Sequence, residues 1–173
     1  MRMLIIFYSR TGNTRIAATM LAQMLGADLA EIKCKRHGKG PFRYLRAGYE
    51  SVKGVLPAID APVLTPDHYD VAVIAGPIWT SHPALPIRAY LAQTQPLPDR
   101  LALLMTHQGL DPARALSEAQ ALLPQPAAET LTLVSKDIEN GEIRPAVEDF
   151  AERIRRLGAE APRVVSLSAR TAS

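Results

Sequence analysis

An apolar strand, a polar turn and an amphipathic helix follow one another in the first 26 residues, and this succession restricts the fold more than any other stretch. Residues 3–7 form an unbroken apolar run, as expected of a strand that a parallel sheet buries on both faces. After Thr14 the apolar residues recur at helical spacing, and Gly26 stands where a C-cap glycine belongs. These apolar residues are Ile16, Ala17, Met20, Leu21, Met24 and Leu25. The sequence therefore predicts a buried parallel strand covered by a helix.

The turn between this strand and this helix has the composition of an anion-binding site. It consists of Ser9, Arg10, Thr11, Gly12, Asn13 and Thr14. Three hydroxyls, one amide and one glycine allow side-chain and backbone donors to converge on one point. The helix N-terminus behind them stabilises an anion by about 0.3–1 kcal/mol. A simpler interpretation is that Asn13 or Thr14 only caps the helix after a glycine turn.

This turn resembles the phosphate loop of the flavodoxin family, which reads Ser or Thr, any residue, Thr, Gly, Asn, Thr after the first strand. Ser9, Thr11, Gly12, Asn13 and Thr14 all match that pattern. The turn lacks the glycine spacing of dinucleotide-binding loops and the Gly-Lys-Ser/Thr ending of nucleoside triphosphate loops. The resemblance implies that the cofactor is flavin mononucleotide (FMN), with its phosphate held mainly by hydroxyls and amides of residues 9–14.

The rest of the chain repeats the alternation of strand and helix. Strands are expected at residues 3–7, 30–35, 71–75, 101–105 and 130–135, and helices at 42–53, from Pro86, after Asp111 as N-cap, and over 147–157. Such an alternation requires right-handed crossovers and helices on both faces of the sheet. The predicted fold class is α/β, with a doubly wound five-stranded parallel sheet of flavodoxin-like order 2-1-3-4-5. Residues 1–158 are expected to form one FMN-binding domain, and residues 159–173 a flexible tail.

The segment after the third predicted strand contains the chain's one tryptophan, Trp79. Ligands of doubly wound sheets bind at the carboxyl ends of the strands, here between the first and third strands. The resemblance implies that Pro77, Ile78, Trp79 and Thr80 contact the flavin ring, where aromatic stacking adds about 0.5–1.5 kcal/mol. The alternative is that Trp79 covers the end of the sheet and only stabilises the fold.

A third loop follows the fourth predicted strand. Thr106, His107, Gln108 and Gly109 resemble the third flavin loop but lack the aromatic residue that many electron-carrier flavodoxins have there. One face of the flavin would then stay open to a substrate. His82 and His107 are candidates for proton exchange during flavin or quinone reduction, and the alternative is that both are ordinary exposed loop histidines.

The residues 78–82 contain no glycine, which bears on the number of electrons transferred. In electron-carrier flavodoxins a glycine peptide of this loop flips to hydrogen-bond the one-electron-reduced flavin. Here Gly76 precedes Pro77, which restricts the residue before it and lacks an amide donor. A flip would bring a non-glycine residue to positive φ at a cost of about 1–2 kcal/mol. We therefore expect two-electron turnover, as in flavodoxin-like quinone or NAD(P)H reductases, with a one-electron carrier as the alternative.

Composition indicates a globular domain in a reducing compartment. The 173 residues are 47% hydrophobic and 21% charged, enough for a core that buries about 70% of the unfolded surface. The single cysteine, Cys34, excludes an internal disulfide and a multi-cysteine metal site. There is no apolar run of about 20 residues and little room for a signal peptide before the first strand, so we expect a cytoplasmic protein without a membrane partner.

Positive charge is concentrated in one segment, although the formal net charge is only +3. Residues 32–49 contain no acid and the basic residues Lys33, Lys35, Arg36, Lys39, Arg43 and Arg46, with His37. The segment is either a solvated edge strand and helix face or a surface for an acidic partner. No aromatic residues are interleaved at base-stacking spacing, so no nucleic-acid partner is expected. A basic chain also differs from electron-carrier flavodoxins, which are acidic and dock on basic partners.

The predicted partners are FMN, a redox partner protein or small-molecule acceptor, and NAD(P)H as electron donor. No nicotinamide-binding motif is visible, although relatives with this fold that use NAD(P)H often lack one. A phosphorylated receiver domain would need acidic residues after the first and third strands, where this chain has Tyr8, Ser9, Ala75 and Gly76. A flavin-free interaction module on the same fold remains an alternative.

Overall fold

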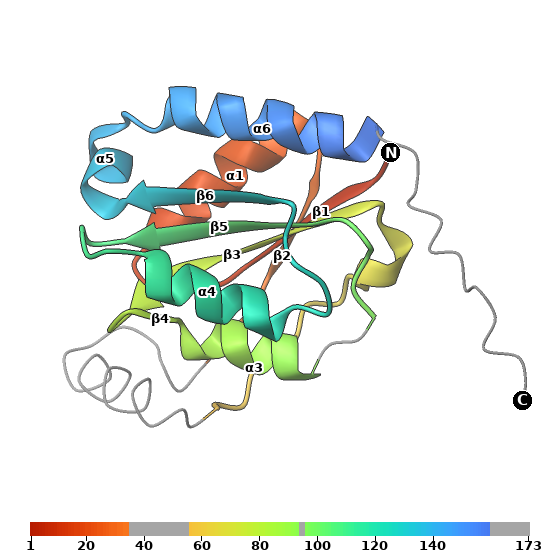
Figure 1. Cartoon of the computed structure of the whole chain (residues 1–173), viewed down its shortest axis with the longest axis horizontal. Coiled ribbons are helices and arrows are strands. Elements are labelled where there is room, and N and C mark those ends of the chain that lie inside the picture. The colour runs from red at the N-terminus through yellow and green to blue at the C-terminus, as the bar shows by residue number, and fades with distance from the viewer. Residues whose placement is uncertain (35–55, 94–95, 160–173) are drawn as a thin grey trace, which may run out of the picture.

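Five parallel strands form the central sheet of the computed structural model, which describes residues 1–34, 56–93 and 96–159. These strands are β1 (Met3–Phe7), β2 (Asp28–Glu31), β3 (Val71–Trp79), β5 (Leu101–His107) and β6 (Glu129–Val134). They lie in the order β2-β1-β3-β5-β6 (Figure 1). Counted along the chain this is the predicted order 2-1-3-4-5, so the prediction of a doubly wound parallel sheet is confirmed.

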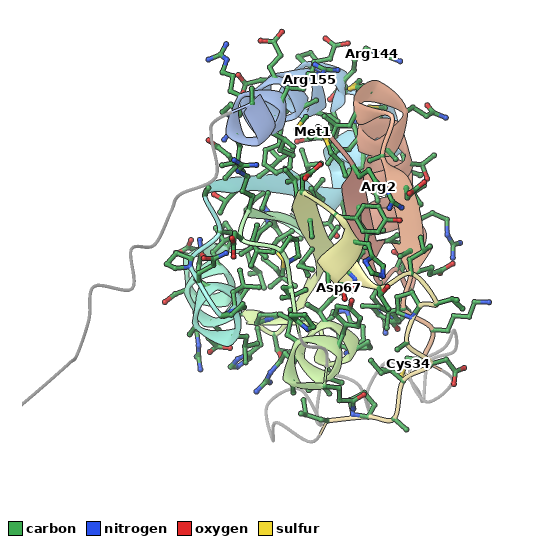
Figure 2. All side chains as sticks on the ribbon, turned by 90° about the vertical axis from the view of Figure 1, so that its right-hand side faces the viewer. Met1, Arg2, Cys34, Asp67, Arg144 and Arg155 are labelled. Carbon is green, nitrogen blue, oxygen red and sulfur yellow. The ribbon has the colours of Figure 1, made fainter. Side chains whose placement is uncertain are left out.

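Helices cover both faces of the sheet (Figures 1 and 2). One face carries α1 (Asn13–Leu25), α5 (Ser135–Asn140) and α6 (Arg144–Ala159), and the other carries α3 (Leu85–Gln93) and α4 (Ala113–Leu122). A short 3-10 helix, η1 (Pro66–His68), precedes β3. In Figure 2 the labelled Arg144 and Arg155 of α6 and the labelled Cys34 lie on opposite sides of the sheet.

Alternate residues of β1 explain the two layers. Ile5 belongs to a core with Leu21 of α1 and Phe150 of α6, whereas Ile6 belongs to a core with Tyr90 of α3. All five are at most 2% exposed. Successive side chains of a strand point to opposite faces, so an unbroken apolar run needs a cover on each face.

The predicted bounds of the second strand were wrong. The expected strand at residues 30–35 lies earlier, at Asp28–Glu31. The Ile32 N–H still donates to the carbonyl oxygen of Phe7, but Lys33 instead pairs with Asp60 in an isolated antiparallel bridge. The chain therefore leaves β1 earlier than its alternating pattern indicates.

The strands next to the predicted loops are longer than expected. β3 continues through Gly76 and Pro77 because both still pair with β5. A two-residue strand that was not predicted, β4 (His82–Pro83), pairs with the last two residues of β3, Ile78 and Trp79. β5 continues through His107, which is opposite Val134 of β6. The predicted loop beginnings at Pro77 and Thr106 are thus strand residues.

The ends of the helices agree with the predicted caps only in part. Gly26 is the C-cap of α1, as predicted, with a φ of 64°. The N-cap of α1 is Gly12, without a side-chain capping bond, so the interpretation of Asn13 or Thr14 as a helix cap is wrong. The N-cap of α4 is Pro112 rather than Asp111, whose Oδ1 nevertheless accepts a hydrogen bond from the Ala113 N–H at 3.0 Å. Helix α5 was not predicted.

Some predictions lie outside the described residues. These are the helix at 42–53, most of the basic segment at 32–49, and the tail apart from Ala159, where α6 ends. Within the three described ranges, no helix has the length and apolar character that crossing a membrane demands.

Candidate functional site

One pocket lies at the carboxyl edge of the sheet, where β1, β3 and β5 end. Its cavity volume is about 210 Å³. The predicted site residues that line it are Arg10, Thr11, Asn13, Thr14, Pro77, Ile78, Trp79, Thr80, Thr106, His107 and Gln108. The fold thus brings all three predicted loops together.

Three predicted site residues do not line the pocket but shape its loops. The Ser9 hydroxyl accepts a hydrogen bond from the Gly12 N–H at 3.2 Å, which closes the first turn. Gly109 has a φ of 93°, and its N–H donates to Nδ1 of His107 at 3.2 Å. These residues therefore shape the backbone of the turns that carry the lining residues.

Two pocket residues were missed by the sequence analysis. Leu110 is 60% exposed at the rim, and Ser135 is the first residue of α5. Ser135 follows the fifth parallel strand, so a hydroxyl there shares the sheet edge that carries the other loops. That position could have identified it, but the alternating pattern predicts a strand that includes Ser135.

The first turn presents hydrogen-bond donors to the pocket. Gly12 has a φ of 115°, a conformation that side chains other than glycine rarely adopt. The first intrahelical bond of α1 runs from Ile16 N–H to the Gly12 carbonyl, so the N–H groups of residues 13–15 have no acceptor within the helix. The Asn13 side chain donates to Glu139 at 2.9 Å and ties the turn to α5. The turn therefore combines free backbone donors with the positive end of the α1 dipole.

Trp79 both lines the pocket and packs on the core. Its ring makes a T-shaped contact with Tyr8, with centroids 5.8 Å apart, and the Arg10 guanidinium lies 5.3 Å from its centroid. Burial raises the pKa of Tyr8 far above its usual value, so its hydroxyl stays neutral. Trp79 therefore both covers the end of the sheet and lines the pocket, so the two alternatives given for it are compatible.

A hairpin turn at the pocket edge stores backbone strain. Trp79 pairs with His82, and the two residues between them, Thr80 and Ser81, have φ values of 48° and 62°. Positive φ at both central residues defines a type I′ turn, where Asn or Gly is usual. This turn contains neither.

The two candidate histidines have different surroundings, and neither is an ordinary exposed loop histidine. His107 is 7% exposed and lines the pocket. Its Nδ1 accepts from Gly109, so the neutral ring carries its proton on Nε2. His82 is not among the lining residues, and its Nδ1 lies 2.7 Å from Glu118. Burial raises the pKa of Glu118, but hydrogen bonds from His82 and Arg114 outweigh burial and hold it below its usual value.

The pocket suits an anion. Arg10 lines it, and among the residues that the structure describes no carboxylate does. The hydroxyls of Thr11, Thr14, Thr106 and Ser135 are further lining groups. A phosphate monoester therefore fits the donors at one end, and an aromatic ring fits the Trp79 end.

The strand order, the two helical layers and the pocket at the switch between β1 and β3 define the flavodoxin-like class of doubly wound α/β proteins. No family model and no curated protein matches the sequence. The comparison with solved structures agrees with this fold class.

Three solved structures illustrate the similarity. A candidate flavoprotein from Bacteroides uniformis has a TM-score of 0.74 at 20% identity, over 87% of this chain and 97% of that one. A flavoprotein from Lactobacillus acidophilus, in complex with FMN, has a TM-score of 0.69 at 19% identity, over 80% and 97%. The apo form of an NADH:FMN oxidoreductase has a TM-score of 0.58 at 15% identity, over 94% and 92%. The chain has the flavodoxin-like fold.

Proposed function

We propose that this chain binds FMN in the pocket and acts as a two-electron oxidoreductase. The observation that carries the proposal is the meeting of the three predicted loops in one pocket with a donor-rich end and an aromatic end. The similarity to a flavoprotein in complex with FMN supports the choice of cofactor. Bound FMN would supply the redox chemistry, and the protein would orient it and tune its potential.

The residues divide into a phosphate end and a ring end. The N–H groups of the first turn, with the hydroxyls of Thr11 and Thr14, would hold the phosphate, because charge-assisted bonds to an anion are about twice as strong as neutral ones. Pro77, Ile78 and Trp79 would flank the ring. The exposed Leu110 at the rim leaves an apolar approach for a substrate or acceptor.

Thr80 and Ser81 already have positive φ, so the expected cost of reaching positive φ on a flip was wrong, but the type I′ turn supports the two-electron part of the proposal in another way. Flipping the peptide between Thr80 and Ser81 would convert the turn to type II′, which has glycine at its first central position. Thr80 occupies that position, and a β-branched residue is disfavoured there. A flip that hydrogen-bonds a one-electron-reduced flavin is therefore costly in this chain.

Stepwise anaerobic reduction of the FMN-reconstituted protein tests cofactor and chemistry together. We expect FMN to bind and the visible spectrum to pass from oxidised to fully reduced flavin without an accumulating intermediate. Accumulation of a one-electron-reduced species would favour a one-electron carrier. A protein that does not retain FMN would refute the proposal and favour a flavin-free interaction module.

Binding to this pocket is checked with a matched pair of variants. Thr14→Val removes a lining hydroxyl and is expected to raise the Kd for FMN. Thr65→Val makes the same chemical change at an exposed position before η1 and is expected to leave the Kd unchanged. Equal effects of the two variants would argue against this pocket.

The electron donor is proposed to be NAD(P)H, and the acceptor a quinone or flavin. The similarity to an NADH:FMN oxidoreductase supports a nicotinamide donor. Turnover of NADH and NADPH with a panel of quinones tests this assignment. A lack of reduction by either nucleotide would instead favour a redox partner protein as donor.

A further inference from the structure

Two buried hydroxyls connect the first and third loops across the end of β3. Thr14 is the second residue of α1, and Thr106 lies near the end of β5. Their Oγ1 atoms are 2.8 Å apart, and each residue is 2% exposed. Because β3 separates β1 from β5, this bond joins two segments that are not neighbours in the sheet.

The pair has one hydroxyl hydrogen left over. Two hydroxyls carry two hydrogens, and their mutual bond uses one of them. Within the described ranges, the structure gives neither hydroxyl a second hydrogen-bond partner. Both residues line the pocket, so the remaining hydrogen is available to a ligand there. Leaving a buried donor without a partner is unfavourable, which favours a ligand that accepts a hydrogen bond.

The surroundings decide which hydroxyl faces the ligand. Thr14 is in the first turn of α1, beside the helix N–H groups without intrahelical acceptors and the positive dipole end. Thr106 is flanked in the sheet by Pro77 of β3 and Leu133 of β6. An anion at the helix N-terminus therefore meets Thr14, and Thr106 lies behind it.

We propose that Thr106 is a positioning residue for the phosphate of the bound flavin. Thr106 donates its hydrogen to Oγ1 of Thr14, and Thr14 donates its own hydrogen to a phosphate oxygen. Hydrogen bonds in such a chain polarise and strengthen one another. The pair therefore selects a phosphorylated flavin over the same ring without phosphate. This inference rests on the proposed FMN function.

Binding of FMN and riboflavin to the apo protein tests the proposal, because the two ligands share a ring and differ in the phosphate. Thr106→Val keeps the shape of the side chain and removes the hydroxyl. We expect it to raise the Kd for FMN by about five- to tenfold, in line with one lost hydrogen bond. The Kd for riboflavin should stay within twofold of wild type, and Thr106→Ser should behave as wild type.

The outcomes separate this inference from the proposed function. If wild type binds neither flavin, the proposed function fails and the inference fails with it. If wild type binds FMN and Thr106→Val weakens FMN and riboflavin equally, or changes neither, Thr106 has no role toward the phosphate and this inference alone is wrong. If Thr106→Val does not fold, Thr106→Ala removes the same hydroxyl with less volume in the buried site, and the same two Kd values decide.

Discussion

Glycine in place of Thr80 should relieve strain that the hairpin now carries. Thr80 has a φ of 48°, and the left-handed region costs a non-glycine residue about 1–2 kcal/mol. Glycine removes this cost but adds about 0.5–1 kcal/mol of backbone entropy to be lost on folding. The exposed Thr80 hydroxyl donates to the Trp79 carbonyl at 2.8 Å. In Thr80→Gly water can replace this hydrogen bond, so its loss changes the free energy of unfolding little.

We expect Thr80→Gly to raise the free energy of unfolding of the apo protein by about 0.5–1 kcal/mol. In a chain of this size, each kcal/mol corresponds to a rise of roughly 2–4 °C in Tm. Denaturant titration measures the gain. Thr80→Ala is the matched control, because it deletes the side chain and keeps a residue that disfavours positive φ. A Thr80→Gly protein no more stable than Thr80→Ala would refute the assignment of strain to this turn.

The same variant has a consequence for the proposed redox chemistry. With glycine at the first central position, the type II′ form of the turn becomes accessible. We expect stepwise reduction of FMN-bound Thr80→Gly to accumulate more one-electron-reduced flavin than wild type. An unchanged reduction profile would mean that the turn does not control the number of electrons transferred.

Two further predictions concern stability. Gly76→Ala places a Cβ against Cγ1 of the buried Ile87, so overpacking should lower the free energy of unfolding by about 1–3 kcal/mol, as denaturant titration would measure. The pKa of Glu118 is lowered in the folded protein, so ionised Glu118 stabilises the fold. This stabilisation is fully present above the unfolded pKa of about 4.3 and is lost as pH falls through the folded pKa. Glu118→Gln should therefore cost about 0.5–1 kcal/mol near pH 7 and nothing near pH 2, as thermal unfolding at both pH values would reveal.

The overall topology follows from local signals in the sequence. The apolar run of residues 3–7, the helical spacing after Thr14 and the C-cap at Gly26 are properties of neighbours along the chain. Strand and helix alternation then leaves few topologies, because crossovers between parallel strands are right-handed. The same local signals placed three loops at one sheet edge, and the pocket contains residues from each of them.

Where the elements end was decided by tertiary pairing. Gly76 and Pro77 are residues that usually end a strand, yet β3 passes through both because they lie opposite Met105 and Thr106 of β5, and the Pro77 carbonyl accepts from the Ala84 N–H at 2.9 Å. His107 remains in β5 because Val134 of β6 lies opposite it. Such partners are distant in sequence, and propensity does not encode them.

The detailed chemistry of the pocket also depended on the tertiary structure. The sequence by itself determined that Thr14 and Thr106 follow the first and fourth predicted strands, and so lie at the same edge of the sheet. The contact between their hydroxyls at 2.8 Å, the pairing of His82 with Glu118, and the positive φ of Thr80 result from the packing of α1, α4 and β4 onto that edge. A hydrogen bond requires two groups within about 3 Å, and only the folded chain fixes separations of that size between segments far apart in sequence.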